Sequence, residues 1–231
     1  MQPIASQPQL ADRVYTALRD AICDGQLAPG APLVQERLAA ELNVSRQPVV
    51  QALALLKTQG FVEAGGRRGL RVTRLEPEGA RRVYAVRGAL DRLAARAAAQ
   101  RVAELPAAQG RDPAEAQLAA AQARGARAMA AGEVAALVEA DIAFHDTVYA
   151  LADNPLIAEA AAVHWFHIRR VMGAVLRGHG QRAAVWREHA ALADAILAGE
   201  VERAGTLAEA HVAEAAAALV AGLEESLALA G

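Results

Sequence analysis

The chain has 231 residues, of which 54% are hydrophobic and 3% aromatic, and alanine alone fills 61 positions. Because alanine favours helices and aromatic residues are scarce, this composition argues against a β-sandwich or a large α/β enzyme. The single cysteine, Cys23, excludes an internal disulfide framework and a cysteine-based zinc cluster, so a metal site would need His and carboxylate ligands. A formal net charge of -2, taken alone, argues against nucleic acid as a partner.

The sequence shows neither a membrane span nor a targeting segment. No run of about 18 apolar residues occurs, and the N-terminal stretch MQPIASQPQLADR lacks the charged head and apolar core of a signal peptide. We therefore expect a soluble, cytoplasmic protein with no membrane partner.

Charge divides the chain into two parts. Residues 1–76 carry a net charge of +2, and residues 77–231 carry -4. Between them, Pro77 and Gly79 interrupt the pattern, as a domain boundary does. We predict a mainly α protein in which an N-terminal domain of residues 8–75 joins an all-helical domain of residues 79–229.

Three helices are predicted in the N-terminal domain. Apolar residues recur at helical spacing from Leu10 to Ile22, and Gly25 follows as a C-terminal cap. Residues 33–42 predict a second helix. Ser45 is placed to cap a third, which tolerates Pro48 in its first turn. The third helix would bury Val49, Ala52, Leu53 and Leu56 and expose Arg46, Gln47, Val50, Gln51, Ala54 and Lys57.

The apolar period then changes to that of two short strands, residues 61–64 and 70–73, around a glycine-rich basic turn. Three helices and a basic hairpin describe a winged helix-turn-helix, which lays its third helix in the DNA major groove. The predicted DNA-binding residues are Ser45, Arg46, Gln47, Val50, Gln51, Arg67 and Arg68. The alternative is that Arg67, Arg68, Arg71 and Arg74 form only a solvated basic hairpin.

This domain resembles the GntR family of bacterial transcription regulators. The resemblance rests on Gly25-x-Leu27-x-Pro29-Gly30-x-x-Leu33, Leu38-Ala39, Leu42-x-Val44-Ser45-Arg46-x-Pro48-Val49, Ala52-Leu53, Gly60-Phe61-Val62 and Gly69. One departure concerns DNA: where the family usually has Arg-Glu, this chain has Val50-Gln51. Valine can meet a thymine methyl and glutamine can pair with adenine, so the resemblance implies a changed operator preference.

Six or seven helices are predicted for the second domain. The first shows apolar Val83, Val86, Leu90, Leu93 and Ala97. A second opens with Asp112 as cap and Pro113 at its first position, and a third follows Gly132. Further helices are expected around residues 155–176, 182–198 and 201–228. The domain is therefore predicted to be a helical bundle.

Four polar residues in this domain have the spacing of a metal site. Asp141 and His145 lie four apart, on one helix face. His189 and His211 lie at similar distances before and after Gly199, so a helix hairpin bent at Gly199 would bring them to nearly the same height. Three imidazoles and a carboxylate suit zinc, nickel or a similar divalent ion. The alternative is a surface aspartate and ordinary interfacial histidines.

The segments Asp141-x-x-Phe144-His145, Glu188-His189 with Ala195-Ile196, and Ala210-His211 resemble the FCD effector domain, the all-helical partner of this winged helix in one GntR subfamily. The resemblance implies a divalent metal on Asp141, His145, His189 and His211. It also places Arg87 near the effector pocket. Spacing alone puts Arg87 at the edge of the buried stripe, where it can hold a carboxylate or pair with Asp91.

Together these patterns favour a DNA-binding transcriptional regulator, a repressor that senses a small organic acid through the metal and Arg87. One small winged helix makes few contacts, so we expect a homodimer on a pseudo-palindromic operator. A second possibility is a metal-dependent enzyme using the same four ligands, although no HExxH or comparable base accompanies them. A third is a purely structural metal.

Overall fold

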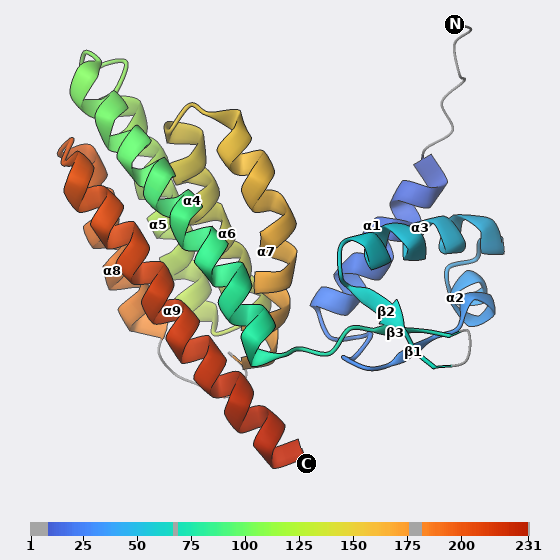
Figure 1. Cartoon of the computed structure of the whole chain (residues 1–231). Helices are drawn as coiled ribbons and strands as arrows, with labels where there is room; N and C mark the ends of the chain where they lie inside the picture. Colours follow the sequence, from blue (N-terminus) through green and yellow to red (C-terminus); the bar gives the residue numbers. More distant parts are fainter. Residues whose placement is uncertain (1–8, 67–68, 176–181, 231) are drawn as a thin grey trace, which may run out of the picture. The chain divides into compact units, whose positions relative to one another are not determined.

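The computed structural model describes residues 9–66, 69–175 and 182–230 (Figure 1). Internal contacts divide the chain into two units between Leu75 and Glu76. Each unit has its own buried apolar residues. The described residues are mostly helical, which confirms the predicted fold class.

The first unit is a winged helix-turn-helix. Its elements in chain order are α1 (Gln9–Cys23), β1 (Pro32–Leu33), α2 (Gln35–Glu41), α3 (Arg46–Thr58), β2 (Val62–Ala64) and β3 (Leu70–Val72). The strands form an antiparallel sheet in the order β1-β3-β2. The hairpin of β2 and β3 was predicted, but β1 was not, and the second helix begins later than expected. A two-residue strand has no period to detect, and β1 forms only through its pairing with β3.

Local sequence explains where α3 lies. Asn43 takes up a left-handed conformation (φ 51) in the turn before it, which asparagine tolerates better than most residues. Ser45 is the N-cap by its extended backbone, although its side chain makes no capping hydrogen bond. Val49 and Leu56 are fully buried with the rest of the predicted inner face, and α3 packs against α1.

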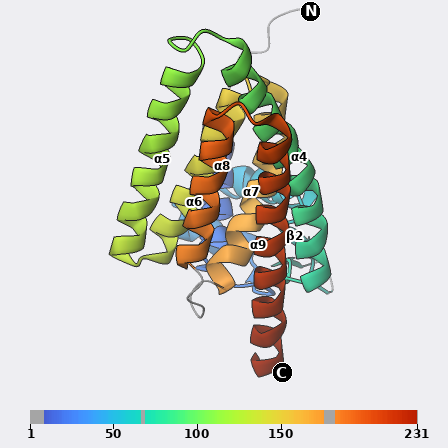
Figure 2. The ribbon, with the colours of Figure 1, turned by 90° about the vertical axis from the view of Figure 1, so that its left-hand side faces the viewer.

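The second unit is a helical bundle (Figure 2). Its elements are α4 (Pro77–Glu104), α5 (Arg111–Ala131), α6 (Val134–Leu151), α7 (Pro155–Val175), α8 (Arg182–Leu197) and α9 (Val201–Ala230). α4 and α9 run side by side along most of their length, and α5 packs against α6 and α8. The predicted bend between α8 and α9 is confirmed, because Gly199 has a φ of 70° that favours glycine.

Two details of the predicted bundle are wrong. α5 begins at Arg111 with Gly110 as its N-cap, so Asp112 and Pro113 lie inside the first turn. The predicted inner stripe of α4 is also incorrect, since Val86 and Leu93 are about half exposed (45% and 51%). α4 instead buries a face that contains charged residues, and these residues belong to the site described below.

Among the described helices, α9 is long and apolar enough over Val201–Ala228 to cross a membrane by length and composition alone. Core helices of soluble proteins meet the same criterion. α9 packs along α4 and contributes a buried histidine, His211, to the bundle interior, as a core helix does.

Candidate functional site

The outer face of α3 is solvent-accessible in the first unit. Ser45, Arg46, Gln47, Val50 and Gln51 are all exposed, and Val50 retains 42% of its accessible surface. Arg46 is held over α2 by an ion pair of 3.1 Å between its Nη1 and Glu36 Oε1. Both partners of this pair are mostly exposed, so it contributes little stability and can exchange for a phosphate. The face predicted to contact DNA is therefore available for binding.

The hairpin beside α3 forms a tight wing. The amide of Gly65 donates to the carbonyl of Gly69 at 2.9 Å, and Gly66 has a φ of 75°. A Cβ at Gly69 would approach the Gly65 carbonyl oxygen to 2.9 Å, so this close approach requires glycine. Arg71 pairs with Glu63 across the strands at 2.6 Å. The predicted contacts Arg67 and Arg68 lie outside the described residues.

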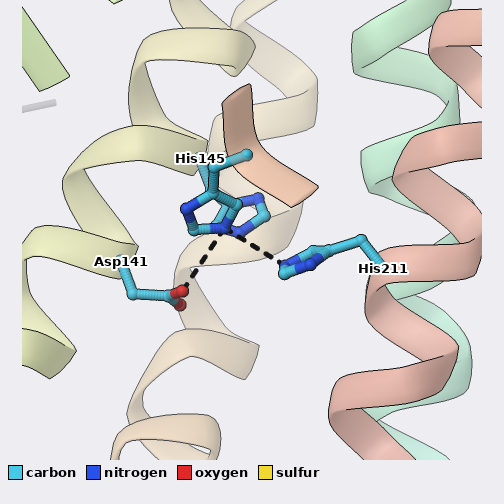
Figure 3. Close-up of side chains that lie close together, drawn as sticks. Asp141, His145 and His211 are labelled. Carbon is cyan, nitrogen blue, oxygen red and sulfur yellow. Dashed lines mark hydrogen bonds and ion pairs between the residues drawn. The ribbon is translucent and has the colours of Figure 1, made fainter. Parts of the chain in front are cut away.

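In the second unit, Asp141, His145, His189 and His211 come together in the bundle interior. α6 contributes Asp141 and His145, α8 contributes His189, and α9 contributes His211. One ligand atom from each lies within 4.8 Å of the others, and all four residues are buried. The Nε2 atoms of His189 and His211 are 3.2 Å apart, and His189 Nε2 is 3.5 Å from Asp141 Oδ1. Figure 3 shows Asp141, His145 and His211 pointing toward one common point.

Two carboxylates orient the histidines from outside this cluster. Asp91 Oδ2 lies 3.2 Å from His145 Nδ1, and Glu188 Oε2 lies 2.7 Å from His211 Nδ1. A carboxylate accepts, so each Nδ1 donates to its carboxylate and the Nε2 of the same ring is left to face the cluster. The hydrogen bond with His211 lowers the pKa of Glu188. Such carboxylate-histidine pairs accompany metal ligands in many proteins.

Ring contacts position the remaining histidine. Phe144 stacks on His189 with a centroid distance of 4.1 Å, and Trp186 meets it edge-on at 4.8 Å. Trp186 in turn packs so closely against α5 that a Cβ at Gly125 would collide with its ring. Glycine at position 125 therefore allows the tryptophan to support His189.

The donor atoms fit a divalent ion. His145 Nε2 is buried without a hydrogen-bond partner among the described residues, which is costly unless something binds nearby. Burial lowers the pKa of His145 and holds that of His189 well below its ordinary value, so both imidazoles are neutral at pH 7. Neutral imidazoles and a carboxylate, each able to offer a lone pair, are the ligands that zinc and nickel prefer.

Arg87 lies beside this cluster on α4 and is 3% exposed. Its Nε donates to Asp91 Oδ2 at 3.2 Å, so the alternative pairing with Asp91 exists. Its Nη2 lies 3.8 Å from Asp141 Oδ2 and has no hydrogen-bond partner among the described residues. The guanidinium also stacks over Trp165, 4.2 Å from the ring centroid. Arg87 thus lies within the buried face, not at its edge as predicted, and its Nη2 lies beside Asp141.

A cavity of about 360 Å³ opens next to Arg87 and the cluster. Arg87, Asp141 and His211 line it together with Tyr84, Glu188, Glu214 and an apolar wall. Its size lies within the range typical of small-ligand pockets. The cavity therefore brings three of the predicted site residues to one surface that a small molecule can reach.

Sequence reasoning missed several residues of this site. Asp91 was considered only as an intrahelical partner of Arg87, and Tyr84 and Tyr149 were not considered at all. The Tyr149 hydroxyl donates to Asp91 from α6, an interaction between residues 58 apart in the chain. The spacing of Arg87 and Asp91 was the one local pattern that pointed to this network.

Comparison with known families agrees with both units. The family described as bacterial regulatory proteins, gntR family, matches residues 10–72, and the FCD domain family matches residues 82–214, which is more than half of the chain. The chain belongs to the GntR family and carries an FCD domain. The predicted family is thereby confirmed. Its members are transcriptional regulators, so the metal-dependent enzyme finds no support.

Relatives of this GntR regulator are similar over part of their length. The HTH-type transcriptional repressor RspR of Escherichia coli K12 is 32% identical over 103 residues, which cover 45% of this chain and 42% of RspR. The uncharacterized regulator YdfH of Escherichia coli CFT073 is 32% identical over 97 residues, 42% of each chain. The matches thus span less than half of these relatives.

Solved structures are similar over nearly the whole chain. A transcriptional regulator GntR from Rhodococcus sp. RHA1 superposes with a TM-score of 0.73 and 27% identity, covering 91% of this chain and 97% of that chain. McbR/YncC of E. coli has a TM-score of 0.75 at 18% identity, covering 92% and 98%, which shows a shared fold.

Proposed function

We propose that this GntR regulator is a cytoplasmic repressor that binds a pseudo-palindromic operator as a homodimer. We further propose that a small organic acid, held at a divalent ion in the FCD domain, changes its affinity for DNA. One observation carries the proposal: three buried imidazoles and a carboxylate converge beside a cavity that the buried Arg87 also lines.

Asp141, His145, His189 and His211 would hold the ion, and zinc and nickel suit this donor set best. When bound, the ion supplies a Lewis-acidic position at which a carboxylate can coordinate. Asp91 and Glu188 keep the imidazoles of His145 and His211 oriented for it.

Arg87 would recognise the carboxylate of the acid. Its planar guanidinium is fixed by Asp91 on one side and by the Trp165 ring on its face, so it loses little freedom on binding. The Nη2 group lies 3.8 Å from Asp141 Oδ2 and can also donate to a ligand in the adjoining cavity.

The exposed face of α3 would supply the DNA contacts. Arg46 and Gln47 precede Val50 and Gln51 by about one helical turn, so all four lie along one side of α3. A homodimer would place two such helices on repeated half-sites. The acid can regulate only if it binds the DNA-competent and DNA-incompetent arrangements with different affinity.

The proposal can be tested by fluorescence anisotropy with the purified full chain. The labelled duplex is the DNA upstream of its own gene, and the control is a scrambled duplex, each at two salt concentrations. We expect specific binding that weakens as salt rises and that changes when lactate is added to zinc-loaded protein. Equal affinity for both duplexes, or an affinity that no organic acid alters, would contradict the corresponding half of the proposal.

A further inference from the structure

The cavity beside the cluster has two chemically distinct ends. Resting on the proposed acid-binding function, we infer that the effector is a 2-hydroxy or 2-oxo monocarboxylate with an apolar tail, and that a second carboxylate on the ligand is disfavoured. The inference follows from the residues that line the cavity of about 360 Å³.

The polar end offers donors in addition to the proposed ion. The Tyr84 hydroxyl and Arg87 Nη2 are both buried, and both residues line the cavity. Burial raises the pKa of Tyr84, so its hydroxyl stays protonated and donates. A simple carboxylate has two oxygens and can accept from both groups, but a neighbouring hydroxyl or oxo oxygen adds a further acceptor, so that one ligand oxygen could coordinate the proposed ion while others accept from Tyr84 and Arg87.

The charges around the cavity favour an anion with a single carboxylate. Within the lining that the structure describes, Arg87 is the only cation, whereas Asp141, Glu188 and Glu214 are anionic. Arg87 is already paired with Asp91. A second carboxylate on the ligand would therefore face Glu188 or Glu214, and the described lining holds no second arginine or lysine to offset it. Repulsion of this kind sets specificity as effectively as attraction does.

The remaining wall is apolar. Its side chains come from α7, α8 and α9 and are Met172, Val185, Ala215, Ala218 and Leu219. A hydroxylated sugar acid would lose its hydrogen bonds to water against this wall, whereas an alkyl chain gains from burial. Each buried methylene is worth about 0.8 kcal/mol, which corresponds to about a fourfold gain in affinity.

The test compares three acids that share one head group, by calorimetry on the zinc-loaded full chain. Lactate is the reference, 2-hydroxyhexanoate adds three methylenes, and malate adds a carboxylate. We expect 2-hydroxyhexanoate to bind about 60-fold more tightly than lactate, and malate to bind more weakly than lactate. Tighter binding of malate than of 2-hydroxyhexanoate would overturn the inference alone. If none of the three acids binds, the proposed acid sensing fails and the inference fails with it.

A pair of variants locates the tail. Ala218→Trp fills the apolar end of the cavity from an exposed position on α9, and Ala221→Trp adds the same ring at an exposed position that does not line the cavity. We expect Ala218→Trp to weaken 2-hydroxyhexanoate at least tenfold and to leave lactate unchanged, while Ala221→Trp changes neither. Equal binding of 2-hydroxyhexanoate by both variants would overturn the assignment of the apolar end.

A third variant tests the repulsion. Glu214→Gln removes one negative charge from the cavity and leaves the side chain almost the same size. Malate should then bind severalfold more tightly than to the unmodified protein, with lactate changed less. Malate affinity that stays unaltered would contradict the electrostatic part of the inference.

Discussion

The buried ion pair between Arg87 and Asp91 gives a sharp prediction for the variant Asp91→Asn. The Asp91 carboxylate accepts from Arg87 Nε and from the Tyr149 hydroxyl and lies 3.2 Å from His145 Nδ1. Burial alone would raise the pKa of Asp91, but His145 and Arg87 outweigh it and hold the pKa at about 2. Asparagine keeps the shape of the side chain but removes the charge that balances Arg87.

The expected loss of stability is large. Removing one partner of a buried ion pair costs about 3–5 kcal/mol, because the other charge stays buried without compensation. The amide of the substituted asparagine still offers one acceptor, and Asp141 Oδ2 lies 3.8 Å from Arg87 Nη2, so we expect a cost near the lower end, about 3 kcal/mol. In a unit of this size each kcal/mol lowers Tm by about 2–4 °C, which predicts a fall of about 9 °C.

Urea and thermal unfolding of the full chain, followed by circular dichroism, measure this loss. The matched control is Glu209→Gln, which breaks the exposed 2.5 Å pair between α9 and Arg92, the residue next to Asp91 on α4, and should cost less than about 1 kcal/mol. Metal affinity is a second readout, since loss of an outer carboxylate typically weakens binding about 10–100-fold. If Asp91→Asn were no more destabilising than the control, the buried network would not hold α4 in the bundle as we argue.

Three further outcomes follow from the structure. Gly125→Ala should destabilise the bundle by about 1–3 kcal/mol in urea unfolding, because the added Cβ meets the Trp186 ring. The control is Gly79→Ala, whose added Cβ meets nothing within 4 Å and which should be neutral or slightly stabilising. Equal changes in the free energy of unfolding for the two variants would contradict the close packing of Trp186 against Gly125. Adding dipicolinate to protein held at a free zinc concentration of about 100 Kd should remove about 2.7 kcal/mol of stabilisation and therefore lower Tm. The same addition to His189→Ala should change Tm little. Val50→Arg should leave the free energy of unfolding unchanged, since position 50 is 42% exposed. It should steepen the slope of log K for DNA binding against log salt concentration by about one unit. An unchanged slope would place position 50 away from the phosphates.

The winged helix could be predicted from the sequence because its determinants are local. The inner face of α3 has a regular apolar period, and Ser45 with Pro48 defines its start. The glycines of the wing stand where the backbone requires them. β1 could not be found in this way, since two residues carry no period and its pairing with β3 is a contact between distant segments.

The ligand cluster was also predicted in part. Helical spacing placed Asp141 with His145, and the bend at Gly199 brought His189 opposite His211. The surrounding network could not be predicted, because a charged residue such as Arg87 is normally assigned to the surface. Only the tertiary contacts with Trp165 and Asp141 make its burial favourable. The same reasoning explains why the apolar Val86 and Leu93 were wrongly placed inside.

We propose that the cluster transmits an effector's presence to the DNA-binding unit. The most direct test titrates 2-hydroxyhexanoate into the complex of zinc-loaded protein with the DNA upstream of its gene and follows anisotropy for the unmodified chain and for His211→Ala. We predict that the acid changes the Kd for DNA at least fivefold in the unmodified chain, as allosteric coupling free energies of about 1–3 kcal/mol imply. His211→Ala should bind the DNA equally well without acid and show no response to it. An equal change in DNA affinity for the unmodified chain and for His211→Ala would show that the cluster does not transmit the effector's presence to the DNA-binding unit.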